Sequence, residues 1–167
     1  MDTLVTRIDA SGAILVGHDG SSQSSLAVHW AADLASRLGV GLHVVRTWTL
    51  SSAPRPSTWG VGYVPPLSEF ETAVLEQLRG DVAGLQLRQD VEVDCHVLHG
   101  AAGRRLVESS PGAEMLVVGS RGIGGFRGLV IGSTAGQVIG HAECPVVVVP
   151  VTAAEQPAEP DAGISRD

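Results

Sequence analysis

The apolar residues of the chain form short continuous runs that alternate with stretches of helical spacing. Five runs have the length and aliphatic content of strands, at residues 13–17, 42–47, 91–98, 115–118 and 146–149. Unbroken apolar runs are typical of strands covered on both faces, as in parallel sheets. The alternation within 91–98 favours a place nearer the sheet edge.

Between these runs, apolar residues recur every three to four positions, as on one face of a helix. Helices are expected at about 26–38, 68–86, 101–109 and 133–141. The first stops at Gly39, and the second opens with Ser68-Glu69-Phe70-Glu71, a capping-box signature. This alternation predicts an α/β fold, a single-domain doubly wound (Rossmann-like) parallel sheet of five strands flanked by four helices.

The two ends and one long connection lack this pattern. Residues 1–12 are expected to be a loose lead-in and 13–150 the domain, while the polar, acidic, Pro/Ala-rich residues 151–167 are expected to be a disordered C-terminal tail. The connection 49–66 is rich in proline and holds Trp59 and Tyr63. Loops of this length are usually functional or mobile, so a lid, a partner surface and simple surface packing all stay open.

Composition narrows the class of protein. A length of 167 residues suits one domain, and the net charge of −7 argues against a general binder of nucleic acids or membrane surfaces. No apolar run approaches the roughly 20 residues of a membrane span, and the N-terminus lacks the basic-then-apolar pattern of a signal peptide. We therefore expect a cytoplasmic protein with neither a nucleic-acid nor a membrane partner.

Two residue types exclude further classes. All 11 basic residues are arginine, which rules out a Schiff-base lysine and the lysine of Walker-type phosphate loops. Cys95 and Cys144 are isolated and lie in or beside apolar runs, so they are expected to be buried thiols. These two cysteines form no CxxC and have no metal-ligand spacing.

One glycine-rich segment, from Met115 to Thr134, carries the clearest chemical signal. A strand ends at Gly119, further glycines follow, and Gly132-Ser133-Thr134 opens a helix. Glycine lets backbone amides approach a phosphate, and a helix N-terminus adds unpaired N–H groups and a favourable dipole. The segment therefore predicts a loop that holds the phosphates of a nucleotide.

Asp19 follows the first strand and is the candidate partner of this loop. Ligands of open parallel sheets bind outside the carboxyl ends of the strands, where the strand order reverses. If the first and fourth strands are adjacent, the carboxylate of Asp19 could accept hydrogen bonds from ribose hydroxyls or hold a metal through water. The alternative is an ordinary turn or helix-capping residue. The neighbouring His18 is more plausible as a packed histidine than as a general base.

Other phosphate motifs do not match. GxxxxGK[ST] is absent because the chain has no lysine, and Gly122-Ile123-Gly124-Gly125 resembles GxGxxG only loosely. The first strand–helix turn, where a dinucleotide fold needs its glycines, contains GHDGSS. Neither a P-loop NTPase nor an NAD-type enzyme is indicated.

The spacing Gly119-x2-Gly122-x9-Gly132-Ser133 resembles the G-2x-G-9x-G-[S/T] signature of the universal stress protein family, in its ATP-binding branch. The resemblance extends to ILVGHDGS around Asp19, LAVHWAADLA in the first helix, LHVV in the second strand and CPVVVV at the last strand. His18 and His141-Ala142-Glu143 depart from the family pattern, but neither touches the glycine motif.

The resemblance implies a sheet of order 3-2-1-4-5 with ATP, accompanied by Mg2+, between strands one and four. Gly17 and Asp19 would border the adenosine, and the backbone of Val44 would face the adenine edge. The residues implied around the phosphates are Val118, Gly119, Gly122, Gly132, Ser133 and Thr134, with Arg121 and Arg127 as candidate sources of charge. The family's dimers imply a homodimer through Val146 to Val149, which would also cover four consecutive valines at a sheet edge.

The residues indicate a binder more strongly than a catalyst. The six histidines are scattered, and no nucleophile elbow or carboxylate pair is evident. The leading hypothesis is a dimeric ATP-binding regulatory protein of the stress response that signals to a protein partner and hydrolyses ATP slowly at most. The alternatives are an adenine-nucleotide hydrolase or transferase on the same scaffold, or a nucleotide-free interaction module.

Overall fold

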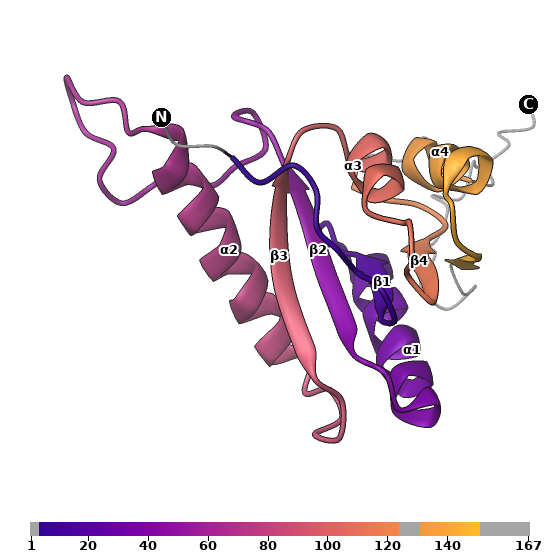
Figure 1. The fold of residues 1–167 in the computed structure, drawn as a ribbon. Coiled ribbons are helices and arrows are strands. Elements are labelled where there is room, and N and C mark those ends of the chain that lie inside the picture. Colours follow the sequence, from indigo (N-terminus) through magenta and orange to yellow (C-terminus); the bar gives the residue numbers. More distant parts are fainter. Residues whose placement is uncertain (1–3, 124–130, 151–167) are drawn as a thin grey trace, which may run out of the picture.

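The computed structural model describes residues 4–123 and 131–150, and Figure 1 shows their arrangement. Strands and helices alternate along the chain as the sequence predicts. The elements are β1 (Ile14–Gly17), α1 (Ser22–Leu38), β2 (Leu42–Trp48), α2 (Leu67–Gly84), β3 (Val93–His99), α3 (Ala102–Glu108), β4 (Met115–Gly119), α4 (Ser133–His141) and β5 (Val146–Val149).

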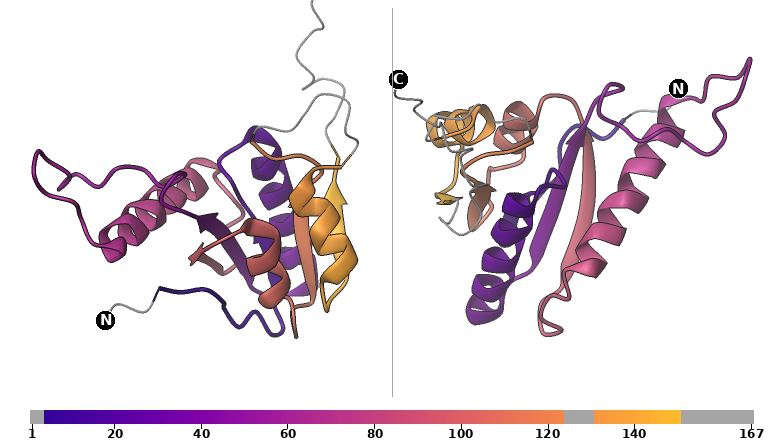
Figure 2. Two further views of the ribbon diagram at one scale, coloured as in Figure 1. Left: turned by 90° about the horizontal axis from the view of Figure 1, so that it is seen from above. Right: turned by 180° about the vertical axis from the view of Figure 1, so that it is seen from behind.

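The five strands form one parallel sheet in the order β3-β2-β1-β4-β5, which confirms the expected fold. Helices α1 and α2 cover one face, and α3 and α4 cover the other, as the rear view in Figure 2 makes clear. β1 and β4 are neighbours at the centre, paired from Ile14 with Met115 to Val16 with Val117. The helix after β1 covers one face of the sheet and the helix after β4 covers the other, so a crevice opens between the carboxyl ends of these two strands.

Each face of the sheet has its own core because successive side chains of a strand point to opposite sides. In β2, Val44 and Trp48 pack with α1 and α2, whereas Val45 packs with α3 and α4. All three side chains are at most 1% exposed. Burying a side chain of this size contributes roughly 1.5–3 kcal/mol to folding, so both faces hold the sheet rigid.

The predicted capping box of α2 does not form. The helix begins at Leu67 after Pro66, whose φ of −64° suits a helix start, and no side chain caps it. Ser68 thus lies inside the first turn. Glu69 turns instead to the preceding loop, where its carboxylate accepts hydrogen bonds from Thr58 and from Tyr63 Oη, the latter at 3.2 Å.

The loop 49–66 projects from the body of the domain beside the start of α2 (Figure 1). Trp59 packs edge-on against Phe70 of α2 at 5.5 Å between ring centroids, and the Arg55 guanidinium lies 5.3 Å from the Trp59 ring. These contacts attach the loop to α2, while Val61 and Val64 remain exposed. A lid, a partner surface and simple surface packing all stay predictions.

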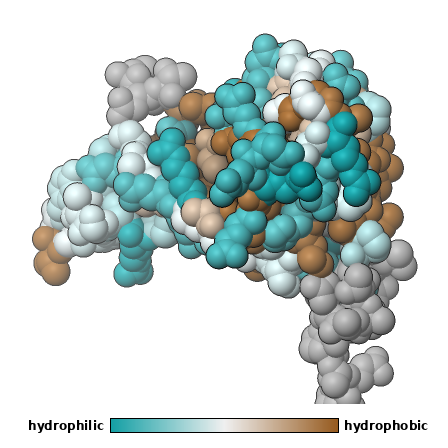
Figure 3. Space-filling view, turned by 90° about the horizontal axis from the view of Figure 1, so that it is seen from below, coloured by the Kyte–Doolittle hydropathy of each residue, from teal (hydrophilic) through white to brown (hydrophobic). Residues whose placement is uncertain are grey.

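The surface of the domain is mostly hydrophilic on the face seen in Figure 3, with hydrophobic residues gathered on the side that carries β4, β5 and α4. Ile139 of α4 is 51% exposed. None of the helices within residues 4–123 and 131–150 has an apolar stretch long enough to cross a bilayer.

Candidate functional site

A cavity of about 400 Å³ opens at the carboxyl ends of β1, β2 and β4. This volume lies within the range of about 300–1,000 Å³ that is typical of small-molecule and cofactor sites. Its wall contains every site residue predicted from the sequence except Val44, namely Gly17, Asp19, Val118, Gly119, Arg121, Gly122, Gly132, Ser133 and Thr134. Arg127 lies outside the described residues.

The start of α4 forms the polar side of the cavity. Its N-cap is Gly132, which has no side chain to cap the helix, and Ser133 and Thr134 line the cavity directly. The Gly132 N–H donates to the Ser120 carbonyl at 2.7 Å, which closes the glycine loop back onto the end of β4. The first amides of a helix have no partner within the helix, so this end presents N–H groups and a positive dipole end to a ligand.

Close backbone approach explains the glycines of the motif. A Cβ on Gly132 would lie 3.4 Å from both the Ser120 carbonyl oxygen and the Arg121 Cα, and one on Gly119 would lie 3.3 Å from the Arg121 carbonyl oxygen. On Gly122 a Cβ would come within 2.7 Å of the Asp19 carboxylate, closer than real contacts allow. The three glycines therefore let the loop fold tightly against itself and against Asp19.

Asp19 joins the two loops that flank the cavity. One carboxylate oxygen accepts hydrogen bonds from the Ser21 N–H at 2.9 Å and the Ser21 hydroxyl at 2.6 Å. The other accepts from the Ile123 N–H of the glycine loop at 2.9 Å. This second oxygen keeps a lone pair for a ligand, since a carboxylate oxygen can accept two hydrogen bonds.

Asp19 is ionised at neutral pH. Burial acts to raise the pKa of Asp19, but the hydrogen bonds from Ser21, Ile123 and Ser24 outweigh it and hold the pKa below its ordinary value. Hydrogen bonds of this kind favour the charged form of a carboxyl group. The cavity therefore carries a fixed negative charge opposite the positive end of α4.

His18 also lines the cavity, and its ring is locked from behind. Nδ1 lies 2.9 Å from Arg46 Nη2, and Nε2 lies 3.3 Å from the Ser25 hydroxyl. Because a guanidinium only donates, Nδ1 must accept and Nε2 must carry the proton. Burial, and then the charge of Arg46, lower the pKa of His18, so the imidazole is neutral at pH 7.

Arg46 holds His18 in place, a role that the sequence did not indicate. Its side chain is 9% exposed, and Nη2 bonds Asp81 of α2 at 2.6 Å. Arg46 Nε also donates to the carbonyl of His18 at 3.4 Å, so the cation braces the β1 loop against α2. The basic residue stands in the otherwise apolar LHVVRTW of β2, but nothing in the sequence pairs it with a carboxylate 35 residues away.

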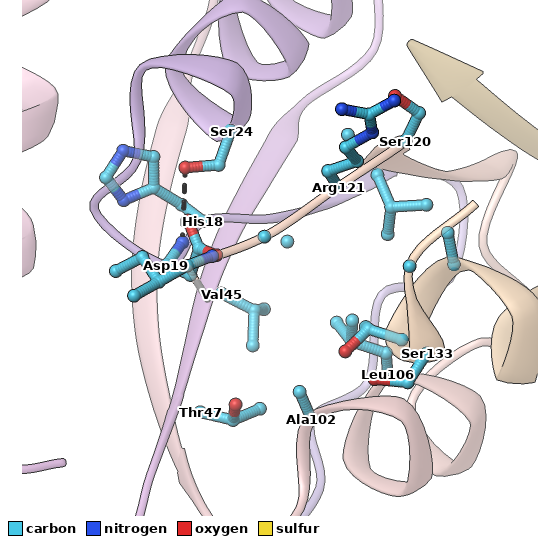
Figure 4. A pocket seen from close by; sticks show the side chains of 18 residues that line it. His18, Asp19, Ser24, Val45, Thr47, Ala102, Leu106, Ser120, Arg121 and Ser133 are labelled. Atoms are coloured by element: carbon cyan, nitrogen blue, oxygen red, sulfur yellow. Dashed lines mark hydrogen bonds between the residues drawn. The ribbon is translucent and has the colours of Figure 1, made fainter. Parts of the chain in front are cut away.

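The other side of the cavity is apolar. Val45 and Thr47 of β2 face Ala102 and Leu106 of α3, as Figure 4 shows, with Asp19 above them and Ser133 beside Leu106. The side chain of Val44 packs in the core of the opposite face, and that of its neighbour Val45 lines the cavity. The resemblance assigns only the backbone of Val44 to the adenine edge, and that assignment stays a prediction.

The described wall offers little for catalysis. Its acidic and histidine residues are Asp19 and His18. Arg46 engages the lone pair of His18 Nδ1, and the one lone pair left on Asp19 belongs to a carboxylate whose low pKa makes it a weak base. Arg121 Nε is buried and has no hydrogen-bond partner among the described residues. The arrangement thus presents one apolar wall, one anion-binding helix end and one fixed carboxylate, which together suit binding of an amphipathic anion.

Comparison with known proteins identifies the family of the chain. The family model of the universal stress protein family matches residues 11–150. Universal stress protein Rv2005c of Mycobacterium tuberculosis (strain ATCC 25618 / H37Rv) is 39% identical over 136 residues, covering 81% of this chain and 44% of that protein. The chain thus spans less than half the length of these curated relatives.

Two solved structures share the fold. The universal stress protein from Archaeoglobus fulgidus in complex with dAMP aligns with a TM-score of 0.57 and 23% identity, covering 84% of this chain and 98% of that one. A universal stress protein family protein from Arabidopsis thaliana with AMP bound aligns with a TM-score of 0.58 and 17% identity, covering 88% and 97%. With the family model spanning the sheet and the glycine motif, the chain belongs to the universal stress protein family.

Proposed function

We propose that this chain is an adenine-nucleotide-binding regulatory protein, with ATP as its nucleotide. The observation that carries the proposal is the division of one cavity into an apolar wall and an anion-binding helix end, with Asp19 between them. An adenine ring, a ribose and a phosphate chain have this same succession of chemistry. The dAMP and AMP complexes of the two structural relatives support an adenine nucleotide.

Each part of the nucleotide then has a partner. The adenine lies against Val45 and Leu106, and the ribose hydroxyls donate to the free lone pair of Asp19. The phosphates lie at the N-terminus of α4, where the first-turn amides and the Ser133 hydroxyl donate to them. Arg121 also lines the cavity and brings a positive charge to the phosphate side of the site.

Mg2+ enters this proposal as a companion of the phosphates. It prefers oxygen ligands and usually keeps several waters together with one or two carboxylates and phosphate oxygens. Asp19 is the carboxylate on the described wall, and its remaining lone pair or a bridging water would reach the ion. When bound, Mg2+ offsets the charge of the phosphates, which otherwise face a protein of net charge −7.

The proposed role is sensing rather than turnover. His18 cannot accept a proton without giving up its bond from Arg46, and Asp19 is held by three donors. Asp19 keeps a lone pair, but its lowered pKa makes it a weak base, so the described wall offers no strong general base to activate water. Nucleotide occupancy would instead change the Asp19–Ile123 contact between the two loops, and a protein partner would read that change.

We further propose that the protein forms a homodimer through β5. This strand pairs with β4 on one side, and all four of its valines are only half-buried. An unpaired hydrophobic edge invites pairing with another chain, and Figure 3 shows hydrophobic residues gathered on this side. A twofold partner pairing at β5 would cover the edge; Val148→Lys should convert the dimer to a monomer in analytical ultracentrifugation.

Calorimetric titration with ATP, AMP and GTP tests the central proposal. We expect 1:1 binding of ATP, weaker binding of GTP because the apolar wall offers guanine no matched polar partners, and turnover of Mg-ATP well below about 1 per second. Saturable binding of no nucleotide at millimolar concentration would reject the proposal. Repeated turnover above that rate would favour the hydrolase or transferase instead. Mass spectrometry of the ligand that co-purifies with the protein provides an independent check.

A further inference from the structure

Two histidines and an aspartate lie together on the sheet, apart from the nucleotide cavity. His43 is on β2, and Asp94 and His96 are on β3. His43 pairs in register with Asp94, and Val45, two residues further on, pairs with His96. Residues two apart on a strand share a face, so all three side chains lie on the same side of the sheet. The two imidazoles are half-buried and the carboxylate is exposed.

We propose that His43, His96 and Asp94 form a binding site for a divalent transition metal, with Zn2+ as the matching ion. One ligand atom from each of the three residues lies within 4.8 Å of the others. Two imidazole nitrogens and a carboxylate oxygen form a donor set that Zn2+ takes readily, and three protein ligands leave a fourth position for water. Mg2+, which prefers oxygen ligands, does not match this site.

The two rings are already close to a coordinating position. Nδ1 of His43 and Nε2 of His96 are 2.8 Å apart, and the rings stack with an interplanar angle of 18°. Nitrogens bound to one tetrahedral Zn2+ at about 2.0–2.1 Å are about 3.3 Å apart. An opening of about half an ångström, within reach of small χ rotations, would admit the ion between them.

The protonation state of the pair also suits a metal. In the hydrogen bond between the rings, one of the two facing nitrogens carries a proton and the other accepts it. Coordination needs both lone pairs, so the donor ring must move its proton to its other nitrogen, a change of tautomer without a change of charge.

The site is separate from the nucleotide cavity. Val45 and Thr47, which lie further along β2 toward its carboxyl end, line the cavity, whereas His43 does not. The metal would therefore clamp β2 to β3 nearer the amino ends of these strands. The rival interpretation is a hydrogen-bonded, stacked histidine pair that stabilises the two strands without any ion.

Zn2+ titration of the full chain, in a buffer that does not bind the metal, tests the site. We expect one Zn2+ per chain and a rise in melting temperature that grows with Zn2+ concentration, as for any ligand of the folded state. His43→Gln and His96→Gln should each weaken binding at least tenfold, and Asp94→Asn at least threefold. The matched control His29→Gln, at an exposed position on α1, should leave the affinity within twofold.

Imidazole 15N spectra identify the ligands directly, because coordination shifts the resonance of the bound nitrogen and removes the hydrogen bond between the rings. Far-UV circular dichroism checks that each variant remains folded. The absence of saturable Zn2+ binding at micromolar concentration would overturn the proposal. So would binding that survives the His43→Gln/His96→Gln double variant, or binding lost in Cys95→Ser or Cys144→Ser instead.

Discussion

Two helices begin beside the cavity, and their first turns are built in opposite ways. α1 starts after Ser21, whose hydroxyl accepts a hydrogen bond from the Ser24 N–H at 3.1 Å. Ser21 in turn donates to Asp19 from both its backbone and its side chain. α4 starts after Gly132, which offers no capping side chain. The amides at the start of α1 thus have a capping side chain, and those at the start of α4 have none.

This difference separates a structural role from a binding role. A capped helix end gains stability, since an N-cap serine contributes about 1 kcal/mol relative to alanine. An uncapped end forgoes that gain and keeps its amides available for an anion. The loop between β1 and α1 therefore serves as a rigid wall, and the loop between β4 and α4 binds the ligand. Asp19 connects them.

Gly122→Val should break the ligand-binding side with the largest effect. The added Cβ would lie 2.7 Å from the Asp19 carboxylate, so either the loop or the Asp19 side chain must move, and either shift disturbs the Asp19–Ile123 contact. We expect ATP affinity to fall by more than tenfold, above about 1.4 kcal/mol, in calorimetric titration. Gly122 is exposed, so the melting temperature should change little.

The matched control is Gly80→Val, the same substitution at an exposed helical glycine with no atom within 4 Å of the added Cβ. It should leave ATP affinity unchanged. Equal affinities of the two valine variants would show that the glycine loop does not hold the nucleotide.

Asp19→Ala tests the connection between the loops. It removes the acceptor of the Ser21 and Ile123 hydrogen bonds and the carboxylate that faces the ribose. We expect a loss of ATP affinity of about tenfold, with the domain still folded. Asp33→Asn on the exposed face of α1 controls for the change in net charge. An Asp19→Ala protein that binds ATP as the wild type does would reduce Asp19 to a turn residue.

The fold could be predicted from the sequence because its strands are short, continuous and apolar. Val146–Val149 and Ser133–His141 were placed at their observed bounds, and the other elements largely overlap the predicted ranges with ends that differ. A short apolar run between two segments of helical periodicity has few possible structures other than a buried strand. The glycine spacing located the ligand-binding loop for a similar reason, since only backbone geometry demands glycine there.

What could not be predicted depends on packing between distant segments. The alternation of β2 puts Val44 and Val45 on opposite faces, but which face borders the cavity depends on where α3 packs. The ion pair of Arg46 with Asp81 likewise depends on the position of α2 across the sheet. Ser68 was predicted as a cap from local sequence alone, while the observed start at Leu67 places Glu69 within reach of the preceding loop.

Replacing the serine at each helix start by alanine tests the same comparison, with smaller expected effects. Ser21→Ala should lower the free energy of unfolding by about 1 kcal/mol, through loss of the α1 cap. Ser133 is exposed and makes no side-chain hydrogen bond to the rest of the described chain. Ser133→Ala should therefore change stability by less than about 0.5 kcal/mol. Its ATP affinity should fall severalfold through loss of a phosphate donor. Chemical denaturation and ATP titration of both variants measure these effects. A larger loss of stability in Ser133→Ala, or a larger loss of ATP affinity in Ser21→Ala, would contradict the division of roles.

The pH dependence of stability gives the smallest effect and tests the rigid wall itself. The pKa of His18 lies below its ordinary value of 6.5 in the folded protein, first because of burial and then because of Arg46. Below pH 6.5 the unfolded chain therefore binds a proton that the folded chain does not. Stability falls as the pH drops through that value toward the folded pKa, and it is fully present above it.

His18→Gln should reduce this loss of stability between pH 7 and pH 5, because the proton that only the unfolded chain binds is then absent. Urea denaturation at both pH values measures the difference. The pKa of His96 is also lowered, so the wild type and His18→Gln should share a remaining slope that His96→Gln removes. If His18→Gln kept the full wild-type slope, protonation of His18 would not oppose Arg46, and the β1 loop would owe its rigidity to Ser21 and Asp19 alone.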